Sequence, residues 1–390
     1  MDLRDFYNRF SLDESLARLT DFNPYYQRID SGLDRKIRVN GHEMIDLASN
    51  NYLGLATDVR VKQAAMEAVQ KYGVSLCGTP IATGYLDLYQ RLEEKISSFV
   101  GLEETIILPS CYQANNGLFS CIAGPQDLIV VDRLAHSSLI QGIKSVGCKM
   151  RPFLHNNLEH LEGILQHSTG YQQVFVVTES VFSTEGSIAP FQQIVQLCET
   201  YNALPVIDDS HGLGVLGKSG RGILEEQEIE GFLGIYTASL GKALANSGGM
   251  ISGKKGLIDY LKYYCPQLVY STALTPAVLA GTEAVLEIIQ SEFEVIKSRL
   301  VSYQQAIYES LVEGGFTVVP GEAPINSIQS GSKEATFILA KKLYEKGILS
   351  TPFIEPSVPV DEGRVRLIAG ANLSWETVAE ATKIIKGIGR

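Results

Sequence analysis

The middle of the chain alternates short apolar runs with amphipathic stretches, and this alternation limits the fold more than any other feature. Between residue 50 and about residue 270, helical spacing is present in VKQAAMEAVQKYG and DLYQRLEEKISSFVG, and both end in glycine. The β-rich runs are ETIILPS, DLIVVD, QVFVVTES, LPVIDDS and LGIYTASLG. Several are apolar on both faces, as in strands buried in a mostly parallel sheet with helices on either side. The sequence therefore predicts an α/β fold.

The flanking regions predict two further parts. The first 45 residues or so are polar, with FNPYYQRIDSGLDRK as a loop and KIRVNGHEMIDLA as a hairpin that turns at Asn40-Gly41. A long helical stretch follows Pro276, and the segments FTVV, GILST and RVRLIA are mixed with helices after residue 300. We expect an N-terminal arm (1–49), a large domain (50–275) and a connecting helix with a smaller C-terminal α+β domain (276–390).

Charge and cysteine usage exclude several classes of protein. The formal net charge of −11 argues against a nucleic-acid or anionic-membrane surface. The cysteines are at positions 77, 111, 121, 148, 198 and 265, and no two form C-x-x-C, so neither a metal site nor a redox motif is indicated. The first residues lack an apolar signal segment, and no apolar run is long enough to span a membrane. These features predict a cytoplasmic protein without membrane or nucleic-acid partners.

The stretch DDSHGLGVLGKSGRG contains a glycine pattern that matches a dinucleotide-binding fingerprint. Residues 212–217 fit G-x-G-x-x-G. That fingerprint requires a helix to start at its last glycine and an acidic residue about 20 positions further on. Here KSGRG follows the last glycine, and no acid ends the IYTAS run. The residues around the glycines therefore argue against nucleotide binding. The glycines would instead allow the chain to turn tightly.

Asp208 and Lys242 suggest a different chemistry. Asp208 ends the buried run LPVID, and Lys242 follows the next β-rich run. Both side chains can reach one pocket at the carboxyl ends of neighbouring strands. An Asp that protonates a pyridinium nitrogen and a Lys that forms a Schiff base suit pyridoxal 5'-phosphate. On spacing alone, the alternative is that both are ordinary surface loop residues.

At this point the chain resembles the pyridoxal phosphate-dependent α-oxoamine synthases, which have the fold-type I architecture. The resemblance rests first on VIDDSHGLGVLGKSGRG and TASLGKALANSGG. Further matches, in chain order, are LASNNYLGLA, PSCYQANNGLF, DRLAHSSLIQG, TESVFSTEGSIAP, YSTALTP and PSVPVDEGRVRL. They span nearly the whole chain. The resemblance implies a fold-type I transferase with a mostly parallel large-domain sheet, and a homodimer with shared active sites.

The resemblance assigns catalytic roles to four residues. Lys242 would be the Schiff-base lysine and the base that deprotonates the amino acid. Asp208 would pair with the ring nitrogen, and His211 would hydrogen-bond the phenolic oxygen. His136 would stack on the ring, although a lone histidine before a helix can equally be a cap or a core residue.

The resemblance also assigns contacts to the cofactor phosphate and to the substrate. The backbone N–H groups of Cys111 and Tyr112 would face the phosphate, since PSCYQANNG reads as strand, turn and helix start. The hydroxyl of Ser239 would add a donor, Ser271 would reach the phosphate of the partner subunit, and Ser183 would lie near the ring oxygen. Two further residues would bind substrate: Arg366 as the carboxylate clamp and Asn50 beside the amino acid. These two can also be ordinary surface residues.

Two departures from the family pattern leave the substrate open. The chain reads Gly78-Thr79-Pro80 and Ala369-Gly370-Ala371-Asn372 near the regions that define the acyl and amino acid pockets. The implied activity is the decarboxylating condensation of an amino acid with an acyl-CoA to an α-amino ketone. We rank an 8-amino-7-oxononanoate synthase-like reaction of alanine with a pimeloyl thioester first. Glycine C-acetyltransferase, serine palmitoyltransferase-like and signalling-ketone synthase activities follow, and an aminotransferase or lyase is the alternative outside this class.

Overall fold

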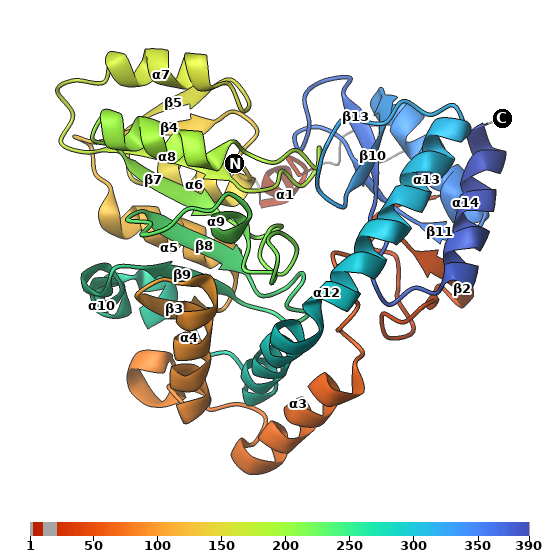
Figure 1. Ribbon diagram of the computed structural model, residues 1–390, viewed down its shortest axis with the longest axis horizontal. Coiled ribbons are helices and arrows are strands. Elements are labelled where there is room, and N and C mark those ends of the chain that lie inside the picture. The colour runs from red at the N-terminus through yellow and green to blue at the C-terminus, as the bar shows by residue number, and fades with distance from the viewer. Residues whose placement is uncertain (1–2, 11–21, 390) are drawn as a thin grey trace.

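A seven-stranded sheet forms the core of the larger part of the computed structural model, on the left of Figure 1, and the model describes residues 3–10 and 22–389. Parts of the predicted N-terminal arm, residues 1–2 and 11–21, and residue 390 lie outside the described residues. The strands, in sheet order, are β3 (Glu104–Leu108), β9 (Gly249–Gly253), β8 (Ile235–Ser239), β7 (Leu204–Asp208), β6 (Val174–Glu179), β4 (Leu128–Asp132) and β5 (Lys149–Phe153). The pairs from β8 to β5 are parallel, and only β9 runs antiparallel to both of its neighbours. The predicted mostly parallel sheet is confirmed.

Helices cover both faces of this sheet, because alternate strand residues bury apolar side chains on opposite faces. One core contains Val130, Val176 and Ile207, and the other contains Val131, Val177 and Val206. The helices of the first core are α3 (Val59–Tyr72), α4 (Asp87–Val100), α7 (Leu158–Gln166), α8 (Phe191–Thr200) and α9 (Ile223–Glu226). Those of the second core are α5 (Cys111–Ile122), α6 (Ser137–Ser145), α10 (Lys255–Tyr264) and α11 (Pro266–Val269).

A long helix, α12 (Pro276–Glu313), connects the large sheet to a second core (Figure 1). Ile289 and Phe293 of α12 pack in the first core of the large sheet, whereas Ile307 and Leu311 pack in the second unit. That unit contains β10 (Asn326–Gly331), β11 (Ile348–Leu349), β12 (Thr351–Phe353), β13 (Gly363–Leu367), α13 (Lys333–Glu345) and α14 (Trp375–Gly389). In the described part of the chain, no helix is both long and apolar enough to span a membrane.

The N-terminal hairpin joins the C-terminal unit. β1 (Ile37–Val39) and β2 (His42–Asp46) pair antiparallel through a turn at Asn40 and Gly41, which have φ values of 49° and 83°. β2 then pairs in parallel with β11, so the hairpin and the C-terminal unit share one three-stranded sheet. The hairpin prediction is confirmed, and two further short elements are α1 (Leu3–Tyr7) and a π-helix, η1 (Pro80–Gly84).

One predicted strand is not formed, and three strands lie where none was predicted. The FTVV segment forms only an isolated bridge, between Val318 and Ile328. We did not predict β5, β9 and β10, because their sequences are KMRPF, GMISG and NSIQSG. Proline, glycine and polar residues weaken the apolar alternation that marks a strand. β5 tolerates its proline because it is an edge strand.

Gly249 starts the antiparallel strand β9 directly against the first turn of α5. A Cβ atom at this position would overlap the backbone N and Cα of Cys111 and the carbonyl carbon of Ser110. Backbone atoms cannot rotate away as a side chain can. The absence of a side chain at Gly249 therefore sets how closely α5 approaches the sheet.

We expect Gly249→Ala to lower the free energy of unfolding by about 1–3 kcal/mol, because α5 or β9 must move. Urea denaturation measures this change. Gly256→Ala is the matched control: Gly256 lies in α10, and no neighbouring atom lies within 4 Å of the place that an added methyl group would occupy. That change should leave stability equal or raise it by up to about 1 kcal/mol. Equal stability of the two variants would show that Gly249 does not limit how closely α5 packs against β9.

Candidate active site

Polar side chains gather where three neighbouring parallel strands end. β6, β7 and β8 are adjacent in the sheet and end at Glu179, Asp208 and Ser239. Glu179 lies opposite Asp208 in the β6–β7 register. Ligands of α/β proteins bind outside the carboxyl ends of such strands. We call this region, with the residues that contact it, the strand-end site.

Asp208 is buried, and hydrogen bonds reach both of its carboxylate oxygens. Ser210 donates its backbone N–H to Oδ1 at 3.0 Å, and Asn115 donates its amide Nδ2 to Oδ2 at 2.7 Å. The Oδ1 of Asn115 accepts from the hydroxyl of Thr237 on β8 at 2.8 Å. Asn115 is fully buried on α5. A helix and a neighbouring strand therefore fix the position of the Asp208 carboxylate.

Lys242 follows β8 in a turn that is closed by a hydrogen bond from Leu240 N–H to the Gly248 carbonyl, at 3.0 Å. The side chain is partly buried, and within the described residues its amine has no hydrogen-bond or ion-pair partner. Burial lowers the pKa of Lys242, and the negative charges of Asp208 and Glu179 oppose the shift. A desolvated amine with a lowered pKa is suited to act as a nucleophile or a base.

His136 caps helix α6 next to this lysine and carboxylate pair. Its Nδ1 accepts from the backbone N–H of Ser138 at 3.3 Å and lies 2.8 Å from that residue's hydroxyl. Its own backbone N–H donates to Glu179 Oε1 at 2.6 Å. Burial lowers the pKa of His136, which favours a neutral ring. The capping role that the sequence left open for His136 is present, and it uses only Nδ1 of the ring. Stacking of His136 on the cofactor ring stays a prediction.

His211 lies behind Asp208 and forms a buried pair with Tyr52. The Tyr52 hydroxyl is 2.7 Å from Nδ1 of His211, and the two rings meet edge to face. Burial and the nearby positive charges of Lys242 and Arg366 hold the pKa of His211 well below its usual value. Burial raises the pKa of Tyr52, so its hydroxyl remains protonated. The pair is thus a neutral phenol and a neutral imidazole.

The N-terminus of α5 lies beside the strand-end site. Ser110 is its N-cap, and the Ser110 hydroxyl accepts from the Gln113 N–H at 3.1 Å. The N–H groups of Cys111 and Tyr112 are in the first turn, where no intrahelical partner exists. The Cys111 thiol lies 3.3 Å from the Ser210 hydroxyl, and burial raises its pKa, so it is not a thiolate.

Ser239 and Ser271 lie on the segments that flank this helix. The Ser239 hydroxyl accepts from the Gly241 N–H at 3.1 Å, within the turn that carries Lys242. The Ser271 hydroxyl accepts from Nε2 of Gln113 in the same chain at 3.1 Å. Ser271 therefore contacts the first turn of its own α5.

Arg366 brings the C-terminal unit to the site. It lies on β13 and is buried, with one terminal nitrogen donating to the Ser183 carbonyl at 3.1 Å and the other to Oδ1 of Asn50 at 3.0 Å. Its Nε is buried without a partner among the described residues. The guanidinium also stacks over Phe353, 5.0 Å from the ring centroid. The two residues predicted to bind substrate, Arg366 and Asn50, thus meet, and Ser183, which was predicted near the cofactor, lies beside them.

Gly212, the first glycine of the pattern, packs against a second buried carboxylate, Asp209. Tyr236 donates its hydroxyl to Asp209 Oδ2 at 2.7 Å, and Ile223 donates its N–H to the same oxygen at 2.9 Å. A Cβ at Gly212 or Gly222 would overlap the Asp209 carboxylate. The stretch continues in turns to residue 222 and no helix starts at Gly217. Close packing accounts for the pattern, with Gly212 against Asp209, Gly214 against Ala243 and Gly217 against Glu225.

The sequence interpretation missed three residues of the site: Tyr52, Asn115 and Glu179. Asn115 lies one helical turn after Cys111, on the face that a helix start beside Asp208 would present. Glu179 ends a strand in the same way as Asp208 does. These two could have been found from spacing. Tyr52 had no local signal, because its partner His211 is far away in the sequence.

The two departures from the family pattern lie on two surrounding segments. Pro80 starts η1, and the Ala273 N–H donates to the Gly78 carbonyl at 3.0 Å, which joins this segment to the one that carries Ser271. Asn372 packs against Gly54, where a Cβ would overlap the Asn372 backbone.

Comparisons with known proteins agree with this arrangement. The family model "Aminotransferase class I and II" matches residues 42–385. A curated 8-amino-7-oxononanoate synthase of Bacillus pumilus is 34% identical over 92% of this chain and 92% of its own length. A serine palmitoyltransferase of Sphingobacterium spiritivorum is 32% identical over 92% of this chain and 90% of its own. A solved serine palmitoyltransferase from S. paucimobilis with a bound PLP–myriocin aldimine has a TM-score of 0.94 at 22% identity, covering 100% of this chain and 98% of its own, and supports the fold.

We predict that Glu179→Gln stabilises the protein increasingly as the pH rises. Burial, and then the charge of Asp208, raise the pKa of Glu179 well above its ordinary 4.5. A carboxyl group with a raised pKa stabilises the folded protein while it is protonated, and this stabilisation is complete below the pKa of the unfolded state. It is lost as the pH rises through the pKa of the folded state. Glutamine stays neutral and still accepts from the His136 N–H. The gain should reach on the order of 1–3 kcal/mol by pH 8 and shrink toward pH 5.

Urea denaturation at several pH values measures this difference. Glu199→Gln is the control, because Glu199 is exposed and its change should be small at every pH. A gain from Glu179→Gln that is independent of pH would contradict the assignment of a buried, protonated Glu179.

Proposed function

Because the chain belongs to the aminotransferase class I and II family and, within it, to the pyridoxal phosphate-dependent α-oxoamine synthases, we propose that it condenses alanine with a pimeloyl thioester, as an 8-amino-7-oxononanoate synthase does. The products would be an α-amino ketone, carbon dioxide and a free thiol. The support is the identity to curated relatives of that name over about nine-tenths of the chain, for example 34% over 92%. The observation that carries the cofactor chemistry is the unpartnered Lys242 amine beside buried Asp208.

Pyridoxal phosphate fits the residues of the strand-end site. The amine of Lys242 has no partner in the described chain, and Asp208 presents a carboxylate that is already oriented by Asn115. The first turn of α5 offers free N–H groups to a phosphate. When bound, the cofactor supplies an electron-withdrawing ring that stabilises negative charge at the α-carbon of an amino acid.

Each buried group would then hold or move a proton at a defined atom. Lys242 Nζ would hold the cofactor, and its amine would accept the α-proton of the amino acid. The Asp208 carboxylate would hold a proton on the ring nitrogen. His211 would donate toward the phenolic oxygen through Nε2, while Tyr52 orients the ring at Nδ1. His136 would cover one face of the ring.

The remaining predicted residues would position the phosphate and the substrate. The N–H groups of Cys111 and Tyr112 and the hydroxyl of Ser239 would donate to the phosphate. Arg366 would bind the substrate carboxylate, since its fork of donors matches two oxygens. Asn50 and the Ser183 carbonyl hold that guanidinium in place.

The proposed substrate pair is tested by screening amino acids against thioesters. Alanine, glycine and serine are each incubated with pimeloyl-, acetyl- and palmitoyl-CoA, and release of free thiol is measured. We expect the highest kcat/KM for alanine with pimeloyl-CoA. A preference for serine with palmitoyl-CoA would instead support the second candidate, which is favoured by the 32% identical serine palmitoyltransferase. Turnover with a keto acid and no thioester would indicate an aminotransferase and contradict both.

We predict that Lys242→Ala abolishes covalent attachment of the cofactor and lowers turnover at least about 100-fold, since loss of a catalytic base alone has this scale. Borohydride reduction followed by peptide mapping should place the cofactor on Lys242 in the wild-type protein. Lys255→Ala is the control, because Lys255 makes a surface ion pair with Glu104 at 2.7 Å. Labelling of a different lysine would refute the assignment.

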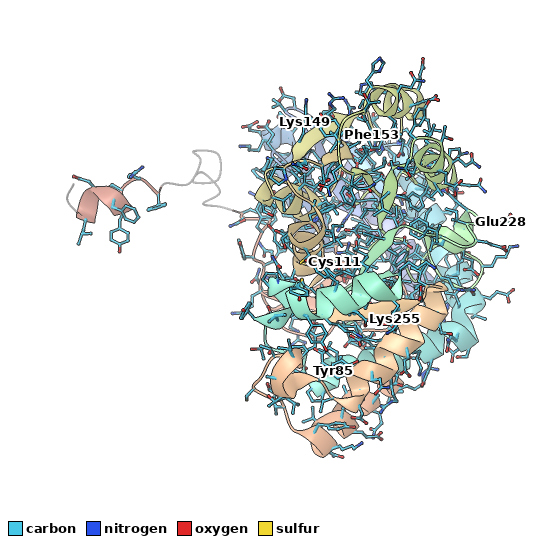
Figure 2. All side chains as sticks on the ribbon, turned by 90° about the vertical axis from the view of Figure 1, so that its left-hand side faces the viewer. Tyr85, Cys111, Lys149, Phe153, Glu228 and Lys255 are labelled. Atoms are coloured by element: carbon cyan, nitrogen blue, oxygen red, sulfur yellow. The ribbon has the colours of Figure 1, made fainter. Side chains whose placement is uncertain are left out.

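We further propose that the enzyme is a homodimer, located in the cytoplasm, with shared sites. Aromatic side chains lie exposed near the site: Tyr112 is 49% exposed and Tyr270 is 83% exposed. The short helix α1 stands away from the rest of the described chain in Figure 2, and Tyr7 and Phe10 are exposed there. A partner subunit would bury such apolar surface. The six cysteines are free, as in proteins of a reducing compartment.

Mixed dimers test whether Ser271 serves the site of its partner subunit. Lys242→Ala and Ser271→Glu are each expected to be inactive, the second because its carboxylate repels the phosphate. If sites are shared, a heterodimer of the two variants has one site free of both changes, and activity returns to up to about half of that of the wild-type dimer. No recovery in a purified heterodimer would mean that Ser271 serves its own subunit, consistent with its contact to Gln113.

A further inference from the structure

Two of the six cysteines meet on the side of α5 that faces the α10–α11 junction. Cys121 is in the last turn of α5, and Cys265 lies between α10 and α11. The Cys121 thiol donates to the carbonyl of Tyr264, the neighbour of Cys265, at 3.4 Å. The Cys265 sulfur lies 2.5 Å from the place that a Cβ of Gly117 would occupy, one turn before Cys121. Both sulfurs therefore lie against the same side of α5, close enough for the two thiols to influence each other.

The two thiols differ in exposure and in charge. Cys121 is partly exposed, whereas Cys265 is fully buried. Contact with the Cys265 thiol lowers the pKa of Cys121 to about 7, against the opposing effect of burial. The same contact, together with burial, raises the pKa of Cys265. Cys121 is therefore the reachable thiol and the one whose pKa is lowered, and Cys265 is its protected neighbour.

We propose that Cys121 and Cys265 form a peroxide-sensitive dithiol that closes reversibly to an intrachain disulfide between α5 and the α10–α11 junction. In the first step the Cys121 thiolate attacks hydrogen peroxide, the O–O bond breaks, and Cys121 becomes a sulfenic acid while hydroxide takes up a proton to leave as water. In the second step the Cys265 sulfur loses its proton and attacks the Cys121 sulfur, and the sulfenic oxygen leaves as a second water. Two thiols are oxidised by two electrons, and one peroxide is reduced to two waters.

The surroundings allow this closure. Gly117 leaves the space that Cys265 occupies beside α5, so the sulfur can approach without displacing a side chain. The disulfide would tie α5, which carries Asn115, to the segment that leads to Ser271. A cross-link between distant parts of the sequence restricts the unfolded chain, so the oxidised protein should be more stable.

Peptide mapping of the cofactor-loaded protein tests the proposal. The protein is treated with a small excess of hydrogen peroxide at neutral pH, and remaining thiols are blocked with iodoacetamide. We expect loss of two hydrogen atoms in mass, a cross-linked peptide that contains Cys121 and Cys265, and full reversal by dithiothreitol. The urea midpoint should shift upward in the oxidised form and return on reduction.

Single substitutions separate this pair from general thiol oxidation. Cys121→Ser should abolish the cross-link, whereas Cys148→Ser, at another partly buried cysteine, should leave it unchanged. In Cys265→Ala, alkylation of Cys121 should need a higher pH than in the wild type, because the thiol contact is gone. If that variant does not fold, the wild-type peptide map decides alone. Cys121 ending as a sulfinic acid, or a disulfide to another cysteine, would overturn the proposal.

Discussion

The buried carboxylate of Asp208 is the constraint around which the site is built. A carboxylate without water is costly unless hydrogen bonds replace its hydration. Asn115 supplies one of them, and its own amide oxygen is fixed by the hydroxyl of Thr237. Since Asn115 belongs to α5, the hydrogen bonds that hold Asp208 also fix how that helix sits on the sheet. The first turn of α5 and the Asp208 carboxylate are thus positioned by a single arrangement of side chains.

Close approach of backbone segments makes this arrangement possible. At Gly249 the antiparallel strand β9 touches the first turn of α5, and around Asp209 two glycines leave room for a second buried carboxylate. Burial raises the pKa of Asp209 to about 7, and Tyr236 and Ile223 hydrogen-bond it. The turn after β7 is therefore held by Asp209 while Asp208 faces the site. Two adjacent aspartates therefore have separate tasks, Asp208 at the end of β7 and Asp209 directly after it.

The sequence was sufficient for the parts that follow from local patterns. Apolar runs located most strands of the large sheet, and charged residues at their ends identified Asp208 and Lys242. Strands such as β9 could not be predicted, because glycine and serine carry no apolar alternation and the strand forms only against β3 and β8. Tyr52 was missed for a related reason, since its importance depends on His211, a partner distant in the sequence. Glu179, by contrast, ends a strand as Asp208 does, and that position could have indicated it.

The C-terminal unit takes part in the site through the strand β13 rather than through a flexible attachment. Arg364 forms a largely buried ion pair with Glu185 at 3.1 Å, and Arg366 donates to the Ser183 carbonyl. Both partners lie on the loop that follows β6, so two arginines of one strand fasten the unit to the large sheet. α12 packs in both cores and limits their relative movement further. A carboxylate bound at Arg366 would therefore meet a guanidinium whose distance from Lys242 is already set. The site is thus ordered before a substrate binds.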